Sequence, residues 1–114
     1  MENTLVSLLK EEIYKGDNAQ KICDLIISAA ADIGASDIHI EPLSNVVRIR
    51  YRVDGVLQEI LEYQIFLHQQ VVARYKILAN LKIDESRIPQ DGRISISLEG
   101  RGLDMRVSTL PTVV

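Results

Sequence analysis

The stretch VRIRYRVDGVLQEILE, residues 47–62, decides the fold. Apolar and basic residues alternate along its first half, which is the period of a strand with one buried face and one polar face. Asp54 and Gly55 follow, and this dipeptide favours a two-residue type I′ turn because both central positions of that turn need positive φ. The second half returns as the partner strand. The stretch therefore predicts an antiparallel hairpin.

The same alternation recurs on both sides of this hairpin. Upstream, Ile38 and Ile40 alternate with polar residues until Pro42 ends the strand. Downstream, a turn at residues 89–92 precedes two alternating segments, 93–98 and 103–108, which are joined by a glycine-containing connection. We therefore expect a mainly antiparallel sheet of about five strands with one polar face left open.

Three other stretches have helical periodicity. The first is predicted from apolar residues at helical spacing, namely Leu5, Leu8, Leu9 and Ile13. Gly16 is placed to end this helix in a left-handed conformation. Asp17 is then expected to cap a second helix, with Gln20 in a capping-box position and Gly34 at the far end. A third helix is expected near residues 65–81.

The predicted order is α-α-β-β-β-α-β-β, an α+β fold with helices packed on one face of the sheet. We divide the chain into an acidic helical lead, residues 1–34, and a sheet domain, residues 35–114, which fold as one unit. A length of 114 residues suits one such domain. Only seven uncharged residues separate Asp24 from Asp32, too few to cross a bilayer.

Charge is distributed unevenly along the chain. Residues 1–47 carry eight acidic and three basic side chains, a net −5, whereas residues 48–114 carry eight acidic and ten basic ones, a net +2. The alternation places five arginines on the open face: Arg48, Arg50, Arg52, Arg93 and Arg106. Arginine suits recognition of phosphates and carboxylates, and a solvated strand face is the alternative interpretation.

The sequence contains no complete catalytic motif. No glycine is followed by lysine, which excludes a phosphate-binding loop of the Walker A type. Asp37, His39 and Glu41 share one strand face at a spacing that suits a metal or an acid–base pair, but the only other histidine is His68. We therefore expect no metal site and interpret this face as polar surface or as an interface. Few aromatic residues and a pI near 5.3 argue against nucleic acid as a partner.

Four segments occur in an order that is more informative than any one of them: ASDIHIEP at 35–42, RVDGVL at 52–57, RIPQDGRI at 87–94 and RVSTLPT at 106–112. Together they resemble the domain that precedes the nucleotide-binding core in type II secretion and type IV pilus assembly ATPases. The resemblance covers about residues 20–112. It implies a PAS-like domain of a homohexameric motor that binds ATP and Mg.

The resemblance also implies roles for particular residues. Arg106 lies where the family has an arginine that contacts nucleotide, and Arg93 is a second, weaker candidate; an ion pair with Asp104 is the alternative for Arg106. An interface between domains or subunits is expected for six residues of the open face: Arg48, Arg50, Arg52, Asp37, His39 and Glu41.

The core motifs of the family are missing from the chain, so we expect no ATP hydrolysis and no cofactor in this chain alone. The partners implied are the core ATPase domain, neighbouring subunits and inner-membrane platform proteins, with the parent motor cytoplasmic and peripheral to the inner membrane. A free-standing PAS-like binding or adaptor module is the alternative function. A small enzyme that uses Asp37, His39 and Glu41 is a third. Protein secretion, pilus extension and DNA uptake all remain open for the parent.

Overall fold

The structure is a computed structural model that describes the backbone of residues 3–78, 91–98 and 100–108, and the side chains of residues 3–75 and Asp104. Two helices come first, α1 (Thr4–Lys15) and α2 (Ala19–Ile33). Three strands follow: β1 (Asp37–Pro42), β2 (Val46–Val53) and β3 (Val56–Gln64). A 3₁₀ turn (Ile65–Leu67) leads into α3 (His68–Leu78), and β4 (Asp91–Leu98) and β5 (Arg101–Ser108) end the order. The α+β class is confirmed.

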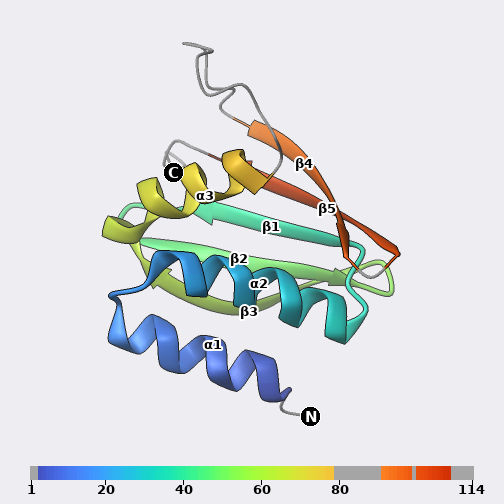
Figure 1. Cartoon of the computed structure of the whole chain (residues 1–114), viewed down its shortest axis with the longest axis horizontal. Coiled ribbons are helices and arrows are strands. Elements are labelled where there is room, and N and C mark those ends of the chain that lie inside the picture. The colour runs from blue at the N-terminus through green and yellow to red at the C-terminus, as the bar shows by residue number, and fades with distance from the viewer. Residues whose placement is uncertain (1–2, 79–90, 99, 109–114) are drawn as a thin grey trace.

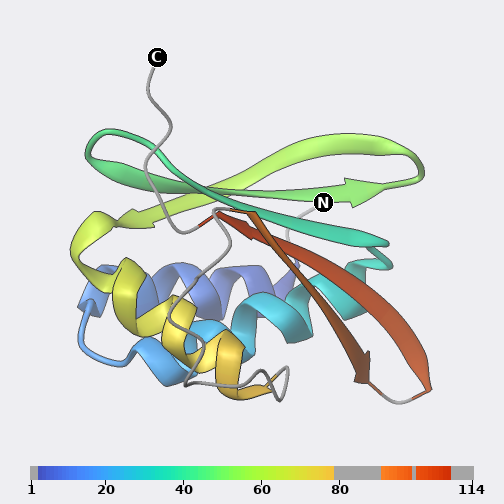
Figure 2. The same ribbon diagram turned by 90° about the horizontal axis from the view of Figure 1, so that it is seen from above.

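The strands form one sheet in the order β3-β2-β1-β5-β4. Strand β1 pairs antiparallel with β2 and parallel with β5, while β2–β3 and β4–β5 are antiparallel hairpins. All three helices lie on the same side of the sheet, and the other face of β1–β3 is open (Figures 1 and 2). The strand alternation therefore separates a face toward the helices from a polar one.

The hydrophobic core lies between the helices and the sheet. The central strands contribute Ile38, Ile40, Val47, Ile49 and Tyr51, all fully buried. The Tyr51 hydroxyl donates a hydrogen bond to the carbonyl oxygen of Ile26 in α2 at 2.6 Å, and Tyr75 of α3 donates one to the carbonyl oxygen of Cys23 at 3.3 Å. Buried tyrosines thus tie α2 to the sheet and to α3.

The helix boundaries confirm one expectation and correct another. Gly16 ends α1 with a left-handed φ of 67°, as expected. The second helix, however, is capped by Asn18 and not by Asp17, because the Asn18 side-chain oxygen accepts the backbone N–H of Lys21 at 3.0 Å. The expected capping box of Asp17 and Gln20 is therefore wrong, because the N-cap lies one residue later, at Asn18.

The buried face of α1 is also rotated from the expected one. Leu8 is 43% exposed, whereas Val6 and Glu12 are buried beside Leu9 and Ile13. Glu12 can be buried because the Lys21 amine of α2 lies 3.1 Å from its carboxylate oxygen. An ion pair between α1 and α2 thus allows a charged side chain to be buried on the packed face of α1.

The central hairpin forms as predicted, with positive φ at Asp54 (52°) and Gly55 (81°). The register then shifts: Arg50 lies opposite Glu59 but Ile49 lies opposite Leu61, so Ile60 forms a bulge in β3.

The turn expected at residues 89–92 is wrong in its second half, because β4 already begins at Asp91 and Arg93 lies inside that strand. Residues 89 and 90 lie outside the described residues.

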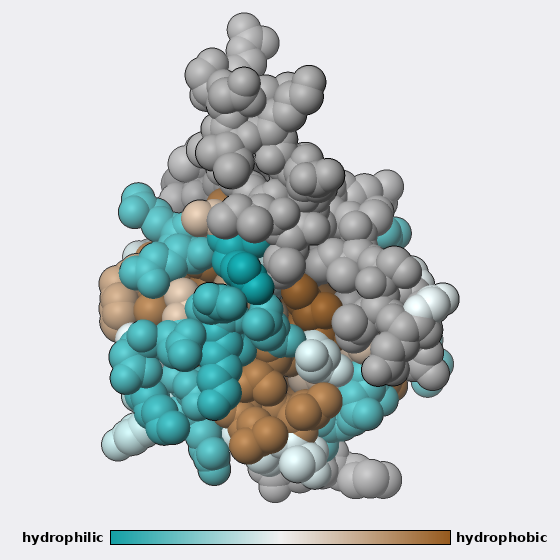
Figure 3. All heavy atoms as spheres, viewed as in Figure 1, coloured by the Kyte–Doolittle hydropathy of each residue, from teal (hydrophilic) through white to brown (hydrophobic). Residues whose placement is uncertain are grey.

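The surface on the helix side carries mostly hydrophilic side chains, with a hydrophobic strip near the middle of the view (Figure 3). Within the described part of the chain, no helix combines the length and the apolar character needed to span a membrane.

The hydroxyl of Tyr51 offers a direct test of this packing. Tyr51→Phe keeps the ring but removes the buried hydrogen bond from the hydroxyl to the Ile26 carbonyl, so we expect a loss of about 1 kcal/mol in the free energy of unfolding, measured by urea denaturation. Tyr14→Phe is the matched control, because the Tyr14 side chain is 90% exposed. Equal stability of the two variants would contradict the assigned role of the hydroxyl.

Candidate functional site

The open face of β1 and β2 carries the charged residues that the sequence singled out. We call this set the charged face: Asp37, His39, Glu41, Arg48, Arg50 and Arg52. The two strands pair so that each acidic or histidine side chain of β1 has an arginine of β2 directly across from it. All six side chains are half-buried. Strand pairing therefore brings the expected interface residues together in one patch.

Glu41 binds two of the three arginines. Its Oε2 atom accepts an N–H of Arg48 at 3.2 Å, and its Oε1 atom accepts the Nε–H of Arg50 at 2.9 Å together with a second N–H of Arg50. Burial alone raises the pKa of Glu41, but the hydrogen bonds and charges of Arg50 and Arg48 outweigh it and hold that pKa below 4.5. Glu41 is therefore ionised at neutral pH and fully engaged.

Arg52 completes the lattice at the other end of the strands. Its Nε atom lies 3.3 Å from Oδ2 of Asp37, and another of its N–H groups donates to the carbonyl oxygen of Gly55 at 3.1 Å. One guanidinium thus joins the start of β1 to the hairpin turn that follows β2. Each arginine of the charged face has a carboxylate partner within its own domain.

His39 has basic residues in register on both sides. Its backbone pairs with Arg50 of β2 and with Arg106 of β5. Burial and the neighbouring Arg50 charge lower the pKa of His39 below its usual value of 6.5. The imidazole is therefore largely neutral at pH 7, and its ring can accept a hydrogen bond as well as donate one.

The two residues singled out for nucleotide contact lie next to each other in the sheet. Arg93 of β4 is the register partner of Arg106 of β5. On the same strand as Arg106, Asp104 is exposed and lies in register with Asp37. The side chains of Arg93 and Arg106 lie outside the described residues, so the choice between nucleotide contact and an ion pair with Asp104 stays a prediction.

The charged face is an ionic lattice in which two carboxylates pair with three guanidinium groups. Asp37, His39 and Glu41 share a face as expected, but both carboxylates are bound to arginines. The described residues contain no group of three histidine, cysteine or acidic side chains arranged to hold a metal ion. Paired half-buried charges of both signs suit a contact surface of defined shape.

Two acidic residues of β3 are in register with arginines of the charged face, and the sequence analysis did not single them out. Glu59 lies opposite Arg50, and Glu62 lies opposite Arg48. Counting back from a two-residue turn at Asp54 and Gly55 gives the first pair directly. The second depends on the bulge at Ile60, which no local signal in the sequence marks.

Replacing Glu41 by Gln tests the lattice. We expect the free energy of unfolding at pH 7 to fall by about 1–2 kcal/mol, because two half-buried guanidinium groups lose their carboxylate. The pKa of Glu41 is lower in the folded state, so its contribution is present above pH 4.5 and is lost as the pH falls through the folded pKa. The difference between the natural chain and the variant should therefore shrink below pH 4.5 in urea titrations.

Glu11→Gln removes an exposed carboxylate of α1 and serves as the control. The free energy of unfolding of this variant should match that of the natural chain both at pH 7 and below pH 4.5. A gap between the natural chain and Glu41→Gln that stays constant from pH 7 to pH 3 would contradict the lattice.

Comparison with known proteins places this arrangement in a family. Residues 14–114 match the family described as Type II/IV secretion system protein. The chain is 49% identical over 92 residues to "Type II secretion system protein E" of Xanthomonas campestris, and 48% identical over 92 residues to "Type II secretion system ATPase E" of Vibrio cholerae. These alignments cover 81% of the chain and 16% and 18% of the relatives.

A third relative, "Type II secretion system protein E" of Pectobacterium carotovorum, is 47% identical over 114 residues, which is 96% of the chain and 23% of that protein. The chain thus spans about a fifth of the length of the curated relatives it matches. The family match begins at Tyr14, so it includes α2 and all five strands but only the end of α1. The chain belongs to the type II/IV secretion system protein family, as a segment related to the secretion ATPase E.

Proposed function

We propose that the chain acts as an assembly and regulatory domain of a hexameric ATPase that powers type II secretion or type IV pilus assembly. The support is the similarity to relatives named as type II secretion system protein E and, in one case, as type II secretion system ATPase E, over a short share of their length. In this proposal ATP and Mg are bound by the core domain of that ATPase, outside residues 1–114. The motor works in the cytoplasm at the inner membrane and contacts platform proteins there.

The ion pairs of the arginines indicate which of them can contact nucleotide in this proposal. Glu41 and Asp37 hold the three arginines of β2, so these are poor candidates for binding phosphate. The next basic residue in the row, past the neutral His39, is Arg106 of β5. We assign Arg106 to charge stabilisation on the transferring phosphoryl group, with Arg93 in a lesser role.

The charged face is assigned to contacts with the core domain or a neighbouring subunit. Half-buried ion pairs fix the shape and sign of a surface before a partner arrives, which favours specificity. We also propose that the sheet is PAS-like and that residues 1–34 fold as one unit with residues 35–114. The support for a single unit is one core cluster that includes side chains of α1, α2, α3 and the strands.

Arg106→Ala in a longer ATPase that carries this domain and its core tests the assignment. We expect the rate of ATP hydrolysis to fall by a factor on the order of 10³, the effect of removing an arginine that stabilises the transition state. Arg101→Ala is the control because it removes an arginine from the far end of the same strand. Its rate should stay within about twofold of the natural protein.

Unchanged hydrolysis in Arg106→Ala would remove Arg106 from the nucleotide site. A gene in which no ATP-binding core accompanies this domain, together with failure to co-elute with such a core, would instead support the free-standing adaptor.

A further inference from the structure

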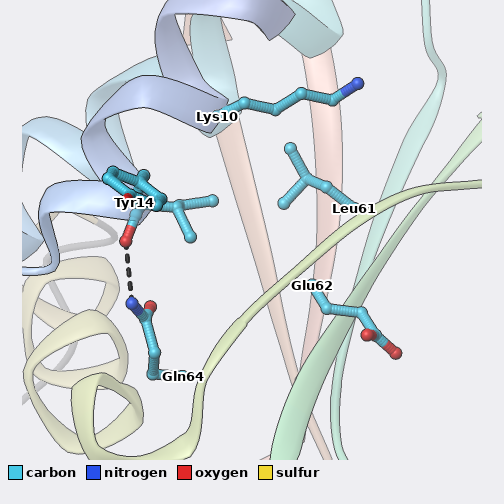
Figure 4. A pocket seen from close by; sticks show the side chains of 6 residues that line it. Lys10, Tyr14, Leu61, Glu62 and Gln64 are labelled. Carbon is cyan, nitrogen blue, oxygen red and sulfur yellow. Dashed lines mark hydrogen bonds between the residues drawn. The ribbon is translucent and has the colours of Figure 1, made fainter.

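Strand β3 forms one edge of the sheet, and no strand pairs with its outer side in the described part of the chain. Helix α1 lies against the second half of β3, where the Gln64 side chain donates to the carbonyl oxygen of Ile13 at 2.8 Å. Figure 4 shows this half, with Leu61 and Gln64 across a pocket from Tyr14 of α1. The first half of the strand, residues 56–60, takes no part in the lining of that pocket.

This first half extends beyond the layer of helices. Gln58 is the register partner of Tyr51, so both side chains lie on the helix side of the sheet. Tyr51 is fully buried, whereas Gln58 is exposed. Val56, on the same side as Gln58, is 60% exposed. The helices therefore cover β2 but leave the first half of β3 uncovered.

The backbone of this half directs hydrogen-bonding groups away from the sheet. Val53 and Val56 flank the two-residue turn and form a hydrogen-bonded pair, and such pairs alternate with non-hydrogen-bonded pairs along an antiparallel ladder. Leu57 and Glu59 therefore belong to non-hydrogen-bonded pairs, and their backbone N–H and C=O groups point outward. No hydrogen bond within the described residues occupies these groups. Unpaired groups of this kind can accept an added strand.

Two carboxylates on the open face indicate which strand fits this edge. Glu59 and Glu62 are exposed and have no ion pair among the described residues. The arginines of β2 opposite them, Arg50 and Arg48, are bound to Glu41. Because of the bulge in β3, the two carboxylates match the spacing of these two arginines, which is two residues of a regular strand. A neighbouring strand with basic residues at alternate positions would therefore face both carboxylates.

The order of charges across the open face supports the same conclusion. Carboxylates of β1 lie beside arginines of β2, and these lie beside carboxylates of β3. A basic strand continues this alternation. Like charges opposite each other destabilise a strand pair, so a second copy of β3, with its own Glu59 and Glu62, fits the edge less well than a basic segment does.

We propose that residues 56–60 bind a short extended segment of a partner protein as an additional antiparallel strand. The segment pairs its backbone with Leu57 and Glu59, places an apolar residue opposite Leu57, and places basic residues opposite Glu59 and Glu62. Hydrogen bonds of the main chain supply affinity, and the alternate side chains supply specificity. The antiparallel direction follows from the greater stability of such pairs per residue. The inference does not rest on the proposed function.

Titration of the isotope-labelled 114-residue chain with the peptide acetyl-VTRTRTV-amide, followed by NMR, tests the proposal. The arginines of this peptide lie on one face of an extended strand, at the spacing of Glu59 and Glu62. We expect saturable shifts of the Leu57 and Glu59 amides. At a free peptide concentration about ten times the Kd, hydrogen exchange of these two amides should slow about tenfold. The Gln58 amide, which is already paired within the sheet, should change less.

Two control peptides separate strand addition from charge attraction. Methylation of both arginine backbone nitrogens keeps the charge but removes N–H donors that face β3, and should weaken binding at least about fivefold. The peptide acetyl-VTETETV-amide places like charges opposite Glu59 and Glu62, and should also bind at least about fivefold more weakly. Equal binding of either control peptide and the arginine peptide would overturn the proposal.

Two matched variants test the carboxylate. Glu59→Gln should weaken binding of the arginine peptide by about threefold. Glu11→Gln makes the same charge change at an exposed position of α1 and should leave the affinity unchanged. Equal weakening in both variants would show non-specific attraction and contradict the proposal. Concentration-dependent shifts at Leu57 and Glu59 without any peptide would assign the edge to a second copy of the chain instead.

Discussion

Strand β1 is hydrogen-bonded to neighbours on both sides, and the positions of the charged residues in the sheet depend on this double pairing. Its antiparallel partner, β2, follows directly in sequence. Its parallel partner, β5, arrives only after α3 and β4, because parallel strands cannot be joined by a tight turn. Asp37 and His39 therefore each receive one neighbour from a nearby segment and one from a distant segment. His39, between Arg50 and Arg106, is the clearest case.

This pairing changes what the arginines can do. Arginines at alternate positions of β2 are of the residue type that suits phosphate binding, yet each of them already has a carboxylate partner inside the domain. Glu41 serves two of them and Asp37 the third. Half-buried carboxylates and guanidinium groups stabilise one another, since each would otherwise lose hydration without gaining a partner. The result is a surface of fixed charges.

The first helix creates a different kind of surface. It packs mainly on α2, where the buried Glu12 lies 3.1 Å from the Lys21 amine and 3.4 Å from that of Lys15. The hydrogen bond from Lys21 lowers the pKa of Glu12 against the effect of burial. Gln64 of β3 donates a hydrogen bond to the Ile13 carbonyl of α1, and a pocket lined by side chains of both elements lies between them. The same geometry leaves the ring of Tyr14 in solvent.

By itself the sequence determined the elements, the hairpin turn at Asp54 and Gly55, and the first part of its register, since these depend on backbone preferences and on alternation within a few residues. It also identified the residues of the charged face. The bulge at Ile60, the Asn18 cap, the burial of Glu12 in place of Leu8 and the partners of each arginine were decided only by the tertiary structure. Each of these depends on a contact, a side-chain orientation or a strand register, and local sequence patterns do not encode which of several adjacent residues fills such a place.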